Sequence, residues 1–160
     1  MSETLQFRRA ILDDADEISD LVSNVSRKHI GPGLCRSGLQ ALLRSMDKEA
    51  TVKRIADGWP GFCALVGQVL VGVAVIKPPG HLYQLFVRSD VQGKGIGRSL
   101  FEIAEKHVID ETGNEIRTVN ASLNAVSVYK RLGFELNGAI MEHDGVRFQP
   151  MLRVQKATIP

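Results

Sequence analysis

The organising segment of this chain is Leu85-Phe86-Val87-Arg88-Ser89-Asp90-Val91-Gln92-Gly93-Lys94-Gly95-Ile96-Gly97-Arg98-Ser99-Leu100. Its first residues are apolar, as in a buried strand, and glycines then alternate from Gly93 to Gly97. Apolar residues recur at helical spacing from Leu100 to Val108. A strand, a glycine loop and a helix N-terminus bring backbone N–H groups and the positive end of a helix dipole together. The segment therefore predicts a site for phosphate groups.

The glycine spacing excludes two common phosphate loops. A Walker A loop requires Gly-x-x-x-x-Gly-Lys-Ser/Thr and a Rossmann loop requires Gly-x-Gly-x-x-Gly, and the segment matches neither. The pattern present is Gln-x-x-Gly-x-Gly, from Gln92 to Gly97. A turn without a ligand is the plain alternative, but three alternating glycines cost chain entropy that a simple turn has no need to lose.

The composition indicates one soluble domain over residues 1–160. Of these residues 44% are hydrophobic and 24% charged, and a formal net charge of +2 gives no reason to expect nucleic acid as a partner. Cys35 and Cys63 lack the spacing of metal ligands, so we expect no metal and two reduced thiols. No apolar run reaches the roughly 20 residues that cross a bilayer. Residues 1–9 lack the apolar core of a signal peptide, so we expect a cytoplasmic protein with no membrane partner.

The order of predicted elements indicates an α/β domain. Apolar alternation and short apolar runs predict strands at 5–10, 62–66, 69–76, 81–87, 116–121, 134–136, 139–142 and 146–152. Helical spacing predicts one helix that begins at Asp13 or Asp14 and two more near 39–46 and 52–56. A further helix follows the glycine loop and runs to about Glu111, with Gly113 as its stop, and a short one spans 124–132. We expect a mixed, mostly antiparallel sheet with helices on both faces, and a loose tail at 155–160.

A second motif follows the glycine loop, and it reads Asn124-Ala125-Val126-Ser127-Val128-Tyr129-Lys130-Arg131-Leu132-Gly133-Phe134. It predicts a short helix closed by glycine, in which Tyr129 could simply pack in the core. The two patterns, Gln-x-x-Gly-x-Gly and then Asn-x-x-x-x-Tyr-x-x-x-Gly-Phe, closely resemble the GNAT superfamily of acetyl-CoA-dependent N-acetyltransferases. The predicted order of elements extends this resemblance over nearly the whole chain.

The resemblance implies how acetyl-CoA is bound. The backbone around Leu85, Phe86 and Val87 would bond to the pantetheine arm, and the Val87 N–H would polarise the thioester carbonyl. Asn124 would contact the same arm. Loop amides and two basic side chains would hold the pyrophosphate, which assigns to it Gln92, Gly93, Lys94, Gly95, Ile96, Gly97 and Arg98.

By the same resemblance Tyr129 is the general acid. Acetyl transfer expels a thiolate with an unperturbed pKa of about 8.5, which a phenol of pKa about 10 can protonate. Many members place a glutamate before the loop to deprotonate the amine, but residues 81–87 hold no carboxylate. His81 is the best local candidate for this base. The alternatives are Tyr83 and Gln84, which could order a water, and the weaker candidates Glu142 and His143.

The sequence thus predicts an enzyme that transfers an acetyl group from acetyl-CoA to a primary amine. Direct attack in a ternary complex is expected, because no nucleophile for a covalent intermediate stands out. The missing glutamate leaves a second reading open, a non-catalytic acyl-CoA-binding sensor or interaction module. The acceptor, a small molecule or a peptide amine, is not specified by the mixed charges of 27–56 or by the hairpin at 139–148. A homodimer also stays open.

Overall fold

A computed structural model describes residues 4–153, and the tail expected to be loose at 155–160 lies outside them. The strands are β1 (Leu5–Arg9), β2 (Gly61–Val66), β3 (Val69–Lys77), β4 (His81–Val87), β5 (Thr118–Ser122), β6 (Phe134–Leu136), β7 (Met141–His143) and β8 (Val146–Arg153). The helices are α1 (Ala15–His29), α2 (Arg36–Ser45), α3 (Lys48–Ala56), α4 (Ile96–Thr112) and α5 (Val126–Arg131). Short 3₁₀ turns include η3 (Ser89–Val91) and η4 (Leu123–Ala125).

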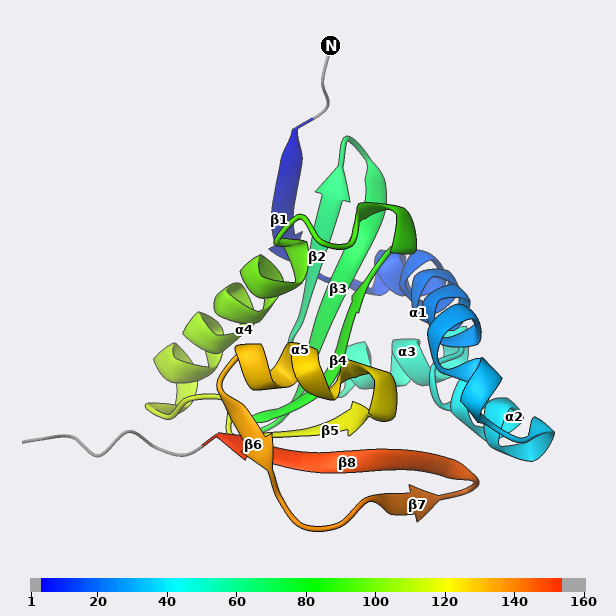
Figure 1. The fold of residues 1–160 in the computed structure, drawn as a ribbon. Helices are drawn as coiled ribbons and strands as arrows, with labels where there is room; N and C mark the ends of the chain where they lie inside the picture. Colours follow the sequence, from blue (N-terminus) through cyan, green and yellow to red (C-terminus); the bar gives the residue numbers. More distant parts are fainter. Residues whose placement is uncertain (1–3, 154–160) are drawn as a thin grey trace, which may run out of the picture.

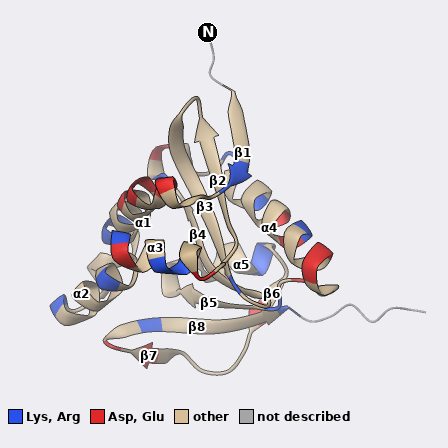
Figure 2. Ribbon diagram, turned by 180° about the vertical axis from the view of Figure 1, so that it is seen from behind, with Lys and Arg blue, Asp and Glu red and all other residues tan. Residues whose placement is uncertain are grey.

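The described strands form one mixed sheet in the order β1-β2-β3-β4-β5-β8-β6, with β7 also paired to β8 (Figure 1). Only the β4–β5 pair is parallel. Helices α1 to α3 cover one face and α4 and α5 the other, so the expected α/β architecture is confirmed. Basic and acidic segments alternate along the helices, whereas the central strands carry few charges (Figure 2).

Each face of the sheet has its own hydrophobic core. On one face, Leu100 and Ala104 of α4 are fully buried against the sheet. Gly72 of β3 makes this approach possible, since a Cβ there would lie 2.9 Å from Leu100 Cδ1. On the other face, Ile18 and Val22 of α1 are at most 1% exposed. Burial of such side chains contributes about 1.5–3 kcal/mol each, and it fixes both helices on the sheet.

Two sequence boundaries move for identifiable reasons. The strand expected from Ile116 begins at Thr118, because Arg117 N–H donates to Gly80 O (3.0 Å) and ties this segment to the preceding turn. The strand expected from Ala139 begins at Met141, after Gly138 adopts a positive φ of 83°. The stop expected at Gly113 is confirmed by its left-handed φ of 76° at the end of α4.

Strands β4 and β5 separate soon after they meet. Their parallel pairing is limited to His81 with Thr118 and Leu82 with Val119. The next residues of β4 contain a bulge, because Ile76 of β3 pairs with Leu82 and its neighbour pairs with Gln84. Beyond this point the edge of β4 that faces β5 has no strand partner among the described residues. The candidate site lies at this separation.

Candidate active site

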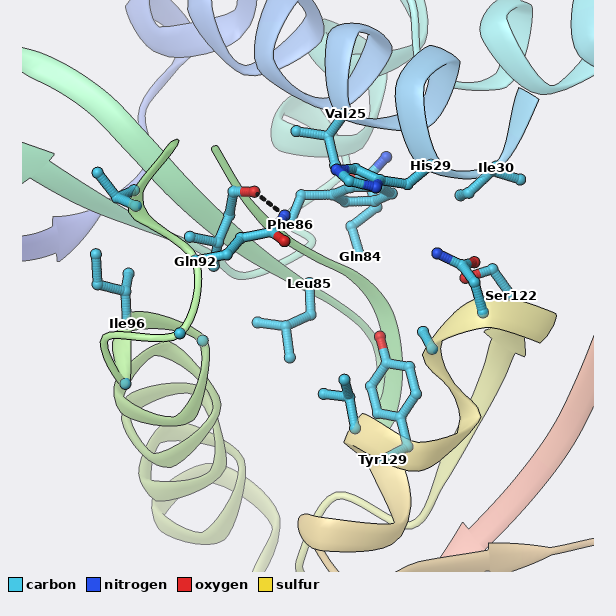
Figure 3. A pocket seen from close by; sticks show the side chains of 18 of the residues that line it. Val25, His29, Ile30, Gln84, Leu85, Phe86, Gln92, Ile96, Ser122 and Tyr129 are labelled. Atoms are coloured by element: carbon cyan, nitrogen blue, oxygen red, sulfur yellow. Dashed lines mark hydrogen bonds between the residues drawn. The ribbon is translucent and has the colours of Figure 1, made fainter. Parts of the chain in front are cut away.

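A cavity of about 400 Å³ lies where β4 and β5 have separated. Its lining comes from four parts of the chain: the end of α1, the outer half of β4, the glycine loop with the start of α4, and η4 with α5 (Figure 3). Cavities that bind small molecules in proteins typically measure about 300–1,000 Å³. The two sequence motifs, which are distant along the chain, therefore meet at one site.

The backbone of outer β4 faces this cavity. Arg88 N–H donates to Val71 O of β3 (2.8 Å), and antiparallel pairs alternate from there. Leu85 and Val87 consequently turn their N–H and C=O groups away from β3, toward the side that β5 has left. Phe86 also lines the cavity, although its backbone belongs to the ladder with β3. These are the strand residues that the sequence assigned to the donor.

The glycine loop is shaped for close approach by a ligand. Gly93 and Gly95 have φ values of 80° and 83°, and a Cβ at either would meet no atom within 4 Å. Gly95 precedes α4, a helix of 17 residues whose first amides have no partner inside the helix. Gln92 lies at the cavity, and its side chain is already engaged, donating from Nε2 to Val87 O (2.9 Å). The loop thus offers backbone N–H groups rather than side chains.

The two basic residues of the loop do not line the cavity. Lys94 is exposed, and its side chain has no ion pair or hydrogen bond to the described residues. Arg98 donates from Nη2 to Arg131 O (3.3 Å), the last residue of α5. Arg98 therefore joins the two helices that border the site, and any contact with a phosphate would be made from its rim.

Tyr129 forms the opposite wall. Its ring is 8% exposed and packs edge-on against Phe134 with 5.9 Å between centroids. The hydroxyl has no hydrogen bond to a described residue and points into the cavity (Figure 3). Burial raises the pKa of Tyr129 to about 12, so the phenol stays protonated at physiological pH. Asn124, on η4, lines the same wall.

His81 does not line the cavity. It sits at the closed end of β4, where its Nδ1 lies 2.8 Å from Thr118 Oγ1 of β5. Burial, followed by the charge of Lys77, lowers the pKa of the His81 imidazole. The residue that the sequence proposed as a base is thus held between two paired strands, away from Tyr129.

The structure adds another histidine that sequence reasoning did not single out. His29, the last residue of α1, lines the cavity, and its Nε2 lies 2.9 Å from Ser89 Oγ (Figure 3). Tyr83 and Gln84, which the sequence offered as alternatives that could order a water, line it as well. None of the described lining residues is Asp, Glu, Lys or Arg. In the sequence His29 is one of many polar residues in a segment of mixed charge, and only the packing of α1 against β4 brings it here.

Other classes of site are not found. Residues 4–153 contain no group of three or more His, Cys, Asp or Glu side chains placed to hold a metal ion. Within the same range no helix has the length and apolarity needed to span a membrane.

Solved structures share this fold. A GCN5-related N-acetyltransferase from Rhodopseudomonas palustris superposes with a TM-score of 0.78 at 22% identity, covering 97% of this chain and 98% of that one. The PaiA N-acetyltransferase from Thermoplasma acidophilum, solved in complex with coenzyme A, gives 0.74 at 18% identity, covering 94% and 99%. At these identities the likeness concerns the fold alone.

The sequence itself also matches a family. No curated protein matches the chain. A family model described as acetyltransferase (GNAT) domain matches residues 30–154, which include both separated strands, the glycine loop and α5. With most of its length inside that match, the chain belongs to the GNAT acetyltransferase family.

Proposed function

We propose that this protein transfers the acetyl group of acetyl-CoA to a primary amine by direct attack in a ternary complex. The observation that carries the proposal is the meeting of three features at one cavity. These are the backbone groups of Leu85 and Val87 that face away from β3, the open glycine loop, and the hydroxyl of Tyr129. Each suits a different part of an acyl-CoA thioester.

The donor half of the cavity fits acetyl-CoA. Free N–H groups at a glycine-rich helix N-terminus favour a pyrophosphate, and the edge of β4 offers main-chain hydrogen bonds to an amide-containing arm. Gln92 holds the Val87 carbonyl and so fixes the strand against the loop. The neighbour from Thermoplasma acidophilum, solved with coenzyme A, supports this assignment by fold. Acetyl-CoA supplies the activated acyl group and a thiol leaving group.

Tyr129 is proposed as the group that donates a proton to the departing sulfur. A phenol with a pKa of about 12 is a weaker acid than the usual thiol. Its hydroxyl nevertheless lines the cavity and carries its proton at neutral pH, so it can hydrogen-bond to the sulfur and protonate it as it leaves.

His29 is proposed as the group that removes the proton from the amine. When His29 Nε2–H donates to Ser89 Oγ, the lone pair on Nδ1 is free to accept a proton. The imidazole and Tyr129 approach the cavity from opposite walls, which leaves the attacking amine between them (Figure 3). His81 could serve only if the acceptor reached the closed end of β4 and β5.

The test is release of free thiol from acetyl-CoA in the presence of a broad panel of amines. The proposal predicts release above the hydrolytic background for at least one amine, with that amine recovered in acetylated form. Tight binding of acetyl-CoA with only background release across the panel would contradict it. That result would favour the acyl-CoA sensor, a reading that the cavity's lack of a carboxylate keeps in play.

A further inference from the structure

A half-buried arginine lies behind Tyr83, which lines the cavity. Arg54 of α3 stacks over the Tyr83 ring, with 4.4 Å from its guanidinium carbon to the ring centroid, and lies 5.8 Å from that of Trp59. Its Nη2 donates to Tyr83 Oη (2.7 Å) and to Ser45 O. Its Nη1 is buried and has no hydrogen-bond partner among the described residues.

This positive charge is not neutralised by a contacting carboxylate. No Asp or Glu of residues 4–153 lies within 4.0 Å of the Arg54 guanidinium. Asp47 acts on it only through space, since the Asp47 carboxylate caps α3 by accepting from Ala50 N–H (2.8 Å). Burial accordingly lowers the pKa of Arg54. A half-buried cation without a contacting counter-ion pays part of the cost of desolvation, and an anion placed nearby would be stabilised.

Two consecutive residues of β4 connect this charge with the cavity. The bulge in β4 allows both Tyr83 and Gln84 to line it. Tyr83 Oη accepts its hydrogen bond from Arg54, so the hydroxyl proton of Tyr83 is left to donate elsewhere. Gln84 is 5% exposed, and its carboxamide makes no hydrogen bond to a described side chain or backbone group. A small void of about 10 Å³ borders both Gln84 and Arg54.

We propose that Tyr83 and Gln84, backed by Arg54, bind a carboxylate of the acceptor, and that the acceptor is therefore an amine of the amino-acid class. This inference rests on the proposed function and names the substrate of the same cavity. An O–H and an N–H donor match the two oxygens of a carboxylate, and the guanidinium behind them favours negative charge. A diamine would instead place a second cation against Arg54, with no acidic lining residue to offset it.

The chain carries its own reporter for this site. Trp59 is the one tryptophan in the sequence, and its ring lies edge-on to Tyr83 with 5.1 Å between centroids. Binding can thus be followed by Trp59 fluorescence, and by calorimetry as a second method, without any acetyl transfer. The probes are a set of amino acids, their carboxamides, the matching amines that lack the carboxyl group, and linear diamines.

We expect the acids that bind to do so roughly 10-fold or more tightly than their carboxamides, the amount that one hydrogen bond to a charged group supplies. Arg54→Met should remove this preference, so that acids and carboxamides bind with similar affinity. Lys53→Met is the matched control, because it removes one positive charge from the neighbouring, exposed position of α3 and should keep the preference. Should Arg54→Met fail to fold, Tyr83→Phe retains the ring beside Arg54 and should also lose the preference.

Three results would overturn the inference: equal binding of acids and carboxamides, tighter binding of diamines, or an equal loss of preference in Arg54→Met and Lys53→Met. Different results would contradict the proposed function and leave the carboxylate site standing, or the other way round. Selective binding of amino acids with no acetyl transfer to any amine would contradict acetyl transfer and keep the carboxylate site. Acetylation of diamines but of no amino acid would support acetyl transfer and contradict the carboxylate site.

Discussion

Gly95 offers a direct way to separate donor binding from folding. It precedes α4 with a φ of 83°, and a Cβ there would meet no protein atom within 4 Å. Gly58, which does not line the cavity, has a φ of 87° and equally open surroundings. Replacement of either by alanine puts a side chain in the left-handed region, which costs about 1–2 kcal/mol of stability. The two variants are therefore matched in backbone strain.

Only the Gly95 variant should bind acetyl-CoA more weakly than wild type. Gly95→Ala places a methyl group on the loop surface that faces the pyrophosphate and shifts the amides beside it. Loss of one hydrogen bond to a charged group costs about 1.5–3 kcal/mol, or roughly a 10- to 100-fold weaker Kd. Gly58→Ala should bind acetyl-CoA as wild type does. Calorimetric titration with acetyl-CoA measures both, and thermal melts confirm that their stabilities fall alike. Equal affinity of the two variants would refute the loop assignment.

Three further outcomes are expected. In an alkaline absorbance titration, the difference between wild type and Tyr129→Phe should show a phenol that ionises near pH 12, because burial raises the pKa of Tyr129 to about 12. The neutral form is favoured in the fold, so this contribution to stability holds below the unfolded pKa of about 10 and is lost as pH rises toward 12; a difference titration centred near pH 10 would show an exposed hydroxyl. His29→Gln should lower kcat at neutral pH about 100-fold and recover at high pH, where the amine is already neutral, whereas His81→Gln should cost less. A larger loss of kcat in His81→Gln than in His29→Gln would instead identify His81 as the base. Gly38→Ala should destabilise the fold by about 1–3 kcal/mol in denaturant melts, since its Cβ would overlap the carbonyl oxygen of Gly145, while Gly33→Ala, with open space, should not.

The parts of the site that could be predicted are those that depend on local sequence. The glycine loop and the end of α4 at Gly113 follow from residue type and spacing, and the structure has them where the sequence indicates. Tyr129 could be found only because two motifs occur together, since a tyrosine on an apolar helix face usually packs in a core. The expected mixed, mostly antiparallel sheet with helices on both faces likewise follows from the order of elements.

The parts that could not be predicted depend on long-range register. Whether His81 faces a cavity is decided by how far β5 stays paired with β4, and that pairing reaches Thr118 and Val119 only. The bulge that brings both Tyr83 and Gln84 to the cavity is an offset between β3 and β4. Neither the extent of the β4–β5 pairing nor the offset between β3 and β4 leaves a local signal in the sequence.

Side chains assigned from the loop pattern also needed the structure. Gln92 belongs to the motif, yet its carboxamide holds the Val87 carbonyl. Arg98 holds the end of α5 through Arg131 O. In the sequence Arg54 is one of several basic residues on a short helix, and only tertiary packing places it, half-buried, behind Tyr83.

The central claim is that the cavity between β4, the glycine loop and α5 carries out acetyl transfer with Tyr129 as its acid. The most direct measurement is turnover and acetyl-CoA affinity, determined together for wild type and Tyr129→Phe with the best amine of the panel. The account predicts a kcat lower by about 100-fold or more with little change in the Kd for acetyl-CoA. An unchanged kcat, under conditions where chemistry limits the rate, would contradict it and leave Tyr129 as a core residue.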